Sequence, residues 1–392
     1  MPRRFAARRH ATARRHAILR HHAAAHRFPA RRFPARRAAA ALALGAAALV
    51  PVAAPPAAGA QAAPSPSGPD SWIPHTDITR SDLTQVPGKL AEPSDDGPHP
   101  GSTTEWWYTH VMDPATHRTF IAMLFTAPVP TAVIFWYPEK GDKVVLPEPT
   151  AQVTAKPGPA VDSSAGSLVW DAARRAYHLR WHGLFAKADI WFDRALPGVT
   201  GGPIRYDGGQ TMYWSAPVAT SRVRGWLQPP GSSSRVSVDG WRGYHDHNWG
   251  QFSVVDQRYS GWEWGVSHEP DGTATLLGGV VKGDGTWQGV VGRVTARETY
   301  GCMTSIKLSD WRTSGLFSYP ETTTLSCPSS LLATPQGLKG ARPGLRTSFH
   351  VVDPFILDAG LLALPESLGR TVPGSLGLIE HIRTLPSRLP HS

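Results

Sequence analysis

The sequence predicts an all-β protein, a sandwich or barrel made of two antiparallel β domains. Short runs rich in Val, Ile, Thr and aromatic residues alternate apolar with polar side chains, as half-buried strands do. Asp-Gly and Asp-Pro turn signals recur, and amphipathic helical patterns are nearly absent before residue 350. The chain beyond residue 98 has roughly 290 residues, more than one small barrel needs. The expected strands are Trp106–Met112, Thr119–Thr126, Ala132–Tyr137, Ala176–Trp181, Ala188–Phe192, Thr211–Ser215, Ser221–Leu227, Gly261–Ser267, Ala274–Val281 and Thr286–Val294.

Two stretches near the C-terminus, Phe355–Leu364 and Ser375–Ile382, break this pattern because they are rich in Leu and Ile. Their composition is compatible with short helices or with an arm that closes the second domain. We expect an N-terminal domain over residues 99–250 and a C-terminal domain with a Leu-rich tail over residues 251–392.

The charge of the chain is unevenly distributed. Its 392 residues carry a formal net charge of +10, but residues 1–60 hold 12 Arg, no Lys and no acidic residue. The rest therefore has 40 − 12 = 28 basic and 30 acidic residues, a formal charge of −2, and it contains all 15 Trp. Binding to nucleic acid depends on clustered Lys and Arg, so this near-neutral, Trp-rich body argues against a nucleic-acid partner.

Residues 1–60 have the organisation of an export signal. Arginine pairs precede an apolar run over residues 38–50, and a small-x-small site ends at Ala60. Arg31-Arg32 before the run is typical of the twin-arginine route, with Sec export as the alternative. The run has 13 residues, whereas a membrane span needs about 20. We expect cleavage near Ala60, an extracellular or cell-envelope location, and a Pro- and Ser-rich linker or arm over residues 61–98.

The two cysteines, Cys302 and Cys327, are expected to form a disulfide because an exported protein meets oxidising conditions. The bond would close a loop of about 25 residues and contribute roughly 3 kcal/mol to stability. Two separate buried thiols are the alternative.

The first segment that could carry chemistry starts at Glu105 and runs Glu-Trp-Trp-Tyr-Thr-His. In an extended strand Glu105 and Trp107 share one face, and Tyr108 lies on the other. A carboxylate beside indoles is costly to bury unless it is hydrogen-bonded or protonated. Glu105 is therefore either a catalytic or ligand-contacting residue or a structural acceptor, and Trp107 and Tyr108 are candidate ligand contacts.

The second segment, residues 243–250, places six polar or aromatic residues between two glycines. Asp and Asn are depleted in strands, and such exceptions often mark functional sites. An Asp close to a His suggests acid–base chemistry. The His-x-His pair, His245 and His247, also suits a metal, but no further ligand motif accompanies it, so no metal is predicted. The remaining alternative is a structural one, in which these polar residues brace a turn. The catalytic candidates are His245, Asp246 and His247, and the ligand-contacting candidates are Tyr244, Asn248 and Trp249.

The third segment is Trp262-Glu263-Trp264 between two glycines, and its indoles form either a ligand-binding wall or a plug at a barrel end. All three residues are candidate ligand contacts. The chain lacks a Gly-x-Ser-x-Gly elbow, a phosphate-binding glycine loop and a dinucleotide fingerprint. Two alternatives stay open: a glycosidase that uses a pair of carboxylates, and a protein that binds polysaccharide by stacking it on aromatic rings.

These three segments, in this order, resemble the carotenoid 1,2-hydratase family, also called the hydroxyneurosporene synthase family, and its AttH-like secreted relatives. The resemblance covers about residue 100 to at least residue 290 and weakens toward the C-terminus. It implies two tandem lipocalin-like β-barrel domains, a large apolar ligand and cofactor-free hydration of an alkene, with His247 and Trp249 matching a His-and-Trp pair of the hydratases. A family Tyr-x-Asp is absent, because the corresponding stretch, residues 273–280, reads Thr-Ala-Thr-Leu-Leu-Gly-Gly-Val.

The sequence thus predicts an exported lipocalin-like protein that binds a polyene- or isoprenoid-like molecule. Cofactor-free acid–base chemistry would hydrate, isomerise or cyclise that ligand, with aromatic faces stabilising a cation. Whether the protein is an enzyme stays open. The alternatives are a non-catalytic carrier or scavenger of an apolar metabolite and a carbohydrate-binding or glycosidic protein. A membrane surface, contacted transiently, is a further partner that the sequence leaves open.

Overall fold

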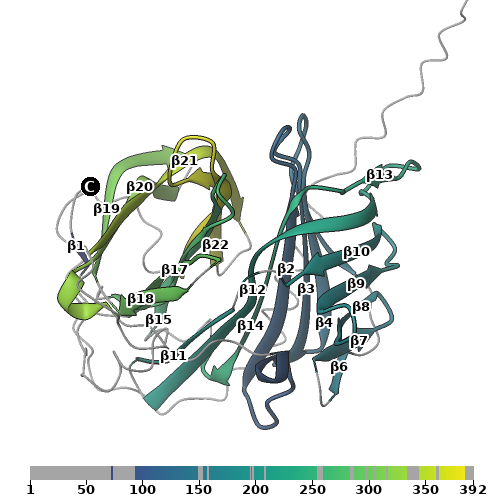
Figure 1. Ribbon diagram of the computed structural model, residues 1–392, viewed down its shortest axis with the longest axis horizontal. Helices are drawn as coiled ribbons and strands as arrows, with labels where there is room; N and C mark the ends of the chain where they lie inside the picture. Colours follow the sequence, from purple (N-terminus) through teal and green to yellow (C-terminus); the bar gives the residue numbers. More distant parts are fainter. Residues whose placement is uncertain are drawn as a thin grey trace, which may run out of the picture. The chain divides into compact units, whose positions relative to one another are not determined.

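The computed structural model describes Trp72–Ile73 and residues 93–384, with gaps at 149–152, 157–158, 195, 197, 207–208, 254–258, 283–286, 297, 304, 315–316, 333–343 and 359–361. The expected export signal and its cleavage site lie outside these residues. The described residues form two antiparallel sheets and the short 3-10 helices η1 (Pro93–Asp96) and η3 (Ser329–Leu331), which confirms the all-β prediction (Figure 1). No helix among them has both the length and the apolar character needed to span a membrane.

The first sheet has 13 strands and contains β14, the strand of the second chemistry-bearing segment, near its middle. Its order is β5 (Val144–Glu148), β4 (Thr131–Tyr137), β3 (Thr119–Ala127), β2 (Thr104–Met112), β14 (Arg242–Gln251), β12 (Gln210–Gln228), β10 (Lys187–Asp193), β9 (Ala176–Trp181), β8 (Gly166–Asp171), β7 (Ala160–Ser163) and β6 (Val153–Lys156), with β11 (Val199–Tyr206) and β13 (Val236–Ser237) also on β12.

The second sheet has 10 strands and curves round an interior, as Figure 1 shows. Its order is β1 (Trp72–Ile73), β19 (Ser305–Ser314), β20 (Phe317–Cys327), β21 (Leu345–Asp358), β22 (Leu362–Arg370), β23 (Leu376–Thr384), β15 (Tyr259–His268), β16 (Ala274–Lys282), β17 (Trp287–Val294) and β18 (Thr299–Met303). Together the sheets match the expected pair of tandem lipocalin-like β domains.

Two local expectations are corrected. The C-terminal stretches expected as short helices or an arm form strands, since β22 pairs β21 and β23, and β23 pairs β15. The ladder satisfies their backbone groups, and side chains such as Leu378 and Ile379 are buried in the core, which outweighs local helix propensity. The two strands predicted over residues 211–227 are one continuous strand, β12, which crosses the first sheet and carries register shifts opposite β14.

Three main apolar clusters define the layers of the fold. One contains residues of the first sheet alone, including Trp107 and Phe192, and another contains residues of the second sheet alone, including Trp287 and Phe349. The third combines both sheets, with Tyr108 and Trp214 from the first and Trp264 from the second. One face of the first sheet therefore covers its own core, and the other face packs against the second sheet.

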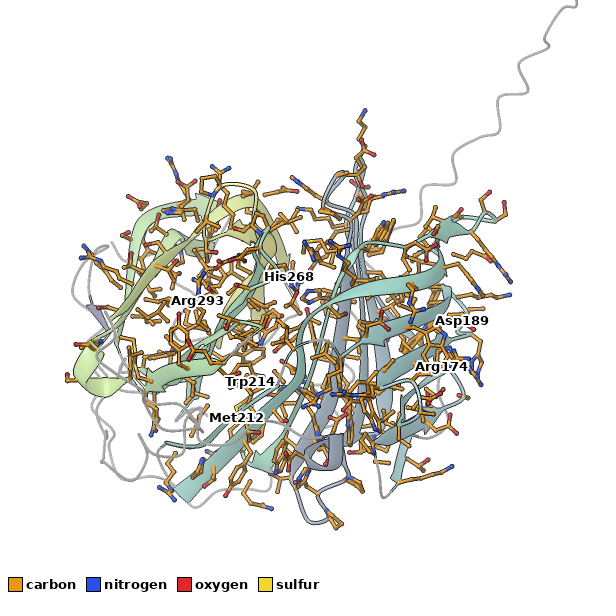
Figure 2. All side chains as sticks on the ribbon, in the orientation of Figure 1. Arg174, Asp189, Met212, Trp214, His268 and Arg293 are labelled. Carbon is orange, nitrogen blue, oxygen red and sulfur yellow. A yellow bond between two sulfur atoms is a disulfide. The ribbon has the colours of Figure 1, made fainter. Side chains whose placement is uncertain are left out.

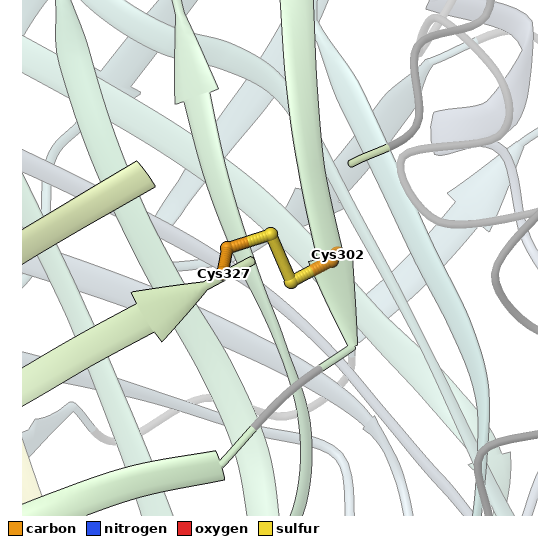
Figure 3. Close-up of a disulfide and its surroundings, with 2 residues drawn as sticks. All are labelled: Cys302 and Cys327. Carbon is orange, nitrogen blue, oxygen red and sulfur yellow. A yellow bond between two sulfur atoms is a disulfide. The ribbon is translucent and has the colours of Figure 1, made fainter. Parts of the chain in front are cut away.

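Cys302 on β18 and Cys327 at the end of β20 are joined by a disulfide, the pairing that the sequence analysis expected (Figure 3). Both side chains are buried in the cluster that belongs to the second sheet. The bond links strands that are not neighbours in the ladder, so it restrains the curvature of this sheet.

Replacing both cysteines by serine is expected to lower the free energy of unfolding by about 3 kcal/mol, because the bond restricts a loop of 25 residues in the unfolded chain. Chemical denaturation of the oxidised wild type and the double variant measures the difference. Equal unfolding free energies would contradict the expectation.

Candidate acid–base site

Strand β14 places polar side chains on both faces of the first sheet. It pairs with β2 on one side and β12 on the other, so its backbone is hydrogen-bonded along both edges. Alternation sends Tyr244, Asp246 and Asn248 to the face shared with the second sheet, and His245 and His247 to the opposite face. All five side chains are buried, and each therefore needs polar partners inside the protein.

Asp246 is held by three donors from its own sheet. Its Oδ2 accepts hydrogen bonds from the Tyr244 hydroxyl at 2.7 Å and from the Trp214 indole N–H at 3.0 Å. Its Oδ1 accepts one from the Asn248 side-chain amide at 3.0 Å. Figure 2 labels Trp214 on β12. These contacts fix the orientation of the carboxyl group. All three donors are neutral, so none of them balances the charge of an ionised Asp246.

Burial dominates the ionisation of this carboxyl. It raises the pKa of Asp246 to about 6, although the hydrogen bonds from Tyr244 and Trp214 act in the opposite direction. Burial and the neighbouring Asp246 also raise the pKa of Tyr244 well above its ordinary value, so the phenol stays a donor. Around neutral pH, Asp246 therefore populates both its protonated and its ionised form.

The second sheet contributes a second carboxyl, Glu380 on β23. The Trp262 indole N–H donates to its Oε2 at 2.8 Å. The side chain keeps some exposed surface, but its carboxyl lies deep among its neighbours, and this burial raises the pKa of Glu380 to about 7. The negative charge of Asp246 raises it further, so the ionisation of the two carboxyls is coupled.

Aromatic rings surround this pair of carboxyls. Trp264 on β15 packs edge-on against Tyr108, with ring centroids 5.2 Å apart, and against Tyr244 at 5.5 Å. These three rings and the indoles of Trp214 and Trp262 line the surroundings of the two carboxyl groups with apolar ring faces. We call Asp246, Glu380, Tyr108, Tyr244 and the indoles of Trp214, Trp262 and Trp264 the carboxyl–indole cluster.

A neutral histidine pair also joins the two sheets. His110 on β2 and His268 on β15 lie with their Nε2 atoms 3.0 Å apart, and His268 Nδ1 is 2.8 Å from the Thr220 hydroxyl. Burial lowers the pKa of His110 well below its usual value and that of His268 to about 3. With both rings neutral, one nitrogen donates and the other accepts.

On the opposite face of β14, His245 is bound to η1. Its Nδ1 donates to the Tyr108 carbonyl at 2.9 Å, and its Nε2 lies 2.8 Å from Asp96 Oδ2. Burial lowers the pKa of His245, but the charge and hydrogen bond of Asp96 outweigh this, so the net shift is upward. The geometry is that of a buried ion pair, which ties the segment before β2 to the sheet.

His247 lies beside Glu105 on the same face. Its Nε2 is 3.3 Å from Glu105 Oε1, and its ring stacks on Trp107 with centroids 4.1 Å apart. Burial opposes ionisation of Glu105, but donors including His247, His99 and Thr126 lower its pKa to about 2. Glu105 is therefore an anion and not a proton donor at neutral pH. Burial lowers the pKa of His247 itself.

Three solved structures are similar to this chain in fold. A protein from Nitrosomonas europaea provisionally described as AttH matches with a TM-score of 0.51 and 15% identity over 78% of this chain and 98% of its own. CghA matches with a TM-score of 0.51 and 13% identity over 76% and 96%. Kievitone hydratase from Nectria haematococca matches with a TM-score of 0.50 and 13% identity over 80% and 98%.

The chain has the AttH-like fold. The resemblance inferred from the three segments is confirmed at this level. No family model matches the sequence, and no curated protein matches it either.

Within the AttH-like fold, the predicted site residues separate into three groups. Tyr108, Tyr244, Asp246, Asn248, Trp262 and Trp264 lie at the face between the sheets. Glu105, Trp107, His245, His247 and Trp249 lie together on the opposite face of the first sheet. Glu263 belongs to neither group, because its Oε2 lies 2.5 Å from His381 Nδ1, and both side chains are buried in the second sheet.

Sequence reasoning missed Asp96, His99, Trp214 and Glu380. Asp96 lies within the Pro- and Ser-rich segment expected as a linker or arm, His99 directly follows that segment, and Glu380 lies in a stretch expected as a helix or arm. Only Trp214 carried a signal, as a Trp within a predicted strand. Strand pairing over long range places Trp214 and Glu380, whereas side-chain contacts with β14 place Asp96 and His99, and local sequence encodes neither.

Replacing Asp96 by Asn is expected to lower the free energy of unfolding by about 3 kcal/mol, because it removes one charge of the buried pair with His245. Urea denaturation measures the change. Asp142→Asn, at an exposed position, is the matched control. A loss no larger than that of the control would argue against a buried ion pair.

Proposed function

We propose that this protein catalyses proton-initiated chemistry on a large apolar, unsaturated molecule of the polyene or isoprenoid type at the carboxyl–indole cluster. Addition of water to a carbon–carbon double bond is the reaction that the geometry supports best. Isomerisation or cyclisation follows from the same cation when water does not reach it. The observation that carries the proposal is that two buried carboxyls, Asp246 from the first sheet and Glu380 from the second, each accept a hydrogen bond from an indole of the carboxyl–indole cluster.

The two carboxyls supply an acid and a base. Glu380, with a pKa of about 7, holds a proton at neutral pH that it can transfer to an alkene carbon, leaving a carbocation on the neighbouring carbon. Asp246, with its lower pKa of about 6, is the better acceptor and takes a proton from the attacking water. Return of that proton to Glu380 closes the cycle, and the net change is one water added to one double bond.

The surroundings of the carboxyls support an apolar substrate and a cationic intermediate. Ring faces carry negative quadrupole potential and stabilise a nearby cation, and Trp is the strongest of the aromatic side chains. Three indoles and two phenols belong to the cluster, and the indoles of Trp214 and Trp262 also donate to the carboxyls. A fold relative that is named a hydratase is consistent with this reading. The Arg-rich leader supports export as part of the proposal.

Incubating the purified full chain with squalene in water labelled with heavy oxygen is expected to give a product heavier by one labelled water. Glu380→Gln and Asp246→Asn should each lower the rate at least about tenfold, or roughly 1.4 kcal/mol of barrier, because each removes a proton-transfer group. Mass spectrometry follows the product, and Glu139→Gln, at an exposed position, is the control.

Three results would contradict parts of this proposal. Unchanged turnover in both variants would exclude these carboxyls as catalysts. Binding of squalene without turnover would indicate a carrier. Oligosaccharides quenching Trp fluorescence where squalene does not would indicate a carbohydrate-binding protein. Organic extraction of the purified protein, followed by mass spectrometry of any bound small molecule, tests the substrate class without an assumed ligand.

The pKa of Glu380 also predicts a pH-dependent stability. Because folding raises this pKa from 4.5 to about 7, the neutral carboxyl stabilises the fold fully below about pH 4.5, and that contribution is lost as the pH rises through 7. Glu380→Gln cannot ionise, so its melting temperature relative to wild type is expected to rise between about pH 5 and about pH 8. Differential scanning calorimetry measures it, and a difference independent of pH would contradict the shift.

A further inference from the structure

A second cluster on β14 lies on the face opposite the carboxyl–indole cluster. His99 Nδ1 and His247 Nε2 are each 3.3 Å from the same oxygen, Glu105 Oε1. The three ligand atoms all lie within 4.8 Å of one another. They come from three parts of the chain: the segment after η1, strand β2 and strand β14.

The spacing of these atoms is that of long hydrogen bonds, and it also suits a shared metal ion. An N–H···O bond is usually about 2.7–3.2 Å long, so both 3.3 Å contacts are long for one. Ligands about 2.0–2.1 Å from a tetrahedral zinc ion are about 3.3–3.4 Å apart along each edge. Two edges of the cluster therefore already have the separation of a tetrahedral site, and the third, between the two imidazole nitrogens, is within 4.8 Å.

The surrounding groups orient the three ligands. Asp96 Oδ1 lies 3.5 Å from His247 Nδ1, and neither atom has a hydrogen-bond partner among the residues that the structure describes. A metal on Nε2 would leave the ring proton on Nδ1, facing that oxygen, which is the carboxylate–histidine–metal arrangement of many metal sites. Thr126 donates to Glu105 Oε2 at 2.6 Å and so directs Oε1 toward the imidazoles.

The cluster has ordered rings and an access route. His99 stacks on Trp249 with ring centroids 3.9 Å apart, which holds its imidazole toward Glu105. The side chains of His247 and Glu105 are 0% and 7% exposed, whereas that of His99 is 31% exposed. An ion can therefore enter past His99, and the carboxylate supplies negative charge for a divalent cation.

We propose that His99, Glu105 and His247 bind one divalent transition-metal ion of the zinc type, with a fourth position left for water. The ligand set of two imidazoles and one carboxylate, with the fourth position unfilled by protein, is typical of open zinc sites. This site is independent of the proton chemistry proposed at Asp246 and Glu380. The sequence predicted no metal because no further ligand motif accompanies His245 and His247; His99 lies outside every motif, and His245 is not part of this cluster.

The test is binding of the metal itself. The full chain is stripped with a chelator, and zinc is titrated by calorimetry and by elemental mass spectrometry, with cobalt absorption reporting tetrahedral geometry. Wild type should bind one ion at this site. His99→Ala and Glu105→Gln should each weaken that binding at least tenfold, whereas His350→Ala, at an exposed position on β21, should not.

His99→Ala is the decisive variant because its side chain is the least buried of the three ligands. Its folding is checked by the melting temperature of the metal-free protein. Zinc should raise the melting temperature of wild type and not that of His99→Ala. Zinc affinity unchanged in both ligand variants, or no binding by wild type, would overturn the proposal, and neither result bears on turnover at Glu380.

Discussion

The whole arrangement depends on a polar strand, β14, at the centre of a sheet. Its backbone is paired on both edges, so its side chains alone decide what lies on each face. Alternation sends acids, amides and phenols to one face and imidazoles to the other, and burial on both faces requires that each find a partner. Asp246 finds Tyr244, Trp214 and Asn248, whereas His245 finds Asp96. One strand thus organises two separate polar clusters.

The second sheet gives the carboxyl–indole cluster its chemistry. Packing of Trp264, Val266 and Leu378 against the first sheet removes water from the face that holds Asp246. Desolvation then outweighs the hydrogen bonds that favour the anion, and it brings the pKa of Asp246 and of Glu380 close to neutrality. On the opposite face the balance is reversed at Glu105, because several donors converge on one carboxylate. The surroundings of each carboxyl, and not its residue type, therefore decide its pKa: Asp246 and Glu380 titrate near neutrality, whereas Glu105 is an anion.

Much of the fold followed from local pattern. Alternation predicted nine of the 23 described strands, because a strand has a fixed period of two: β2, β3, β4, β9, β10, β12, β15, β16 and β17. The strands after residue 350 did not follow, since their Leu- and Ile-rich composition fits several structures and the ladder with β15 decides among them. For the same reason Glu380 could not be placed beside Asp246. His99 and Asp96 were missed because their contacts with β14 join positions about 150 residues apart.

The central claim is that Asp246 and Glu380, one from each sheet, are electrostatically coupled, so that the charge of Asp246 raises the pKa of Glu380. Infrared spectroscopy can follow the Glu380 carboxyl, identified by the band lost in Glu380→Gln, through a pH titration. Because the charge of Asp246 contributes to the raised pKa of Glu380, replacing Asp246 by Asn should lower that pKa from about 7. A Glu380 titration identical in wild type and Asp246→Asn would contradict the account.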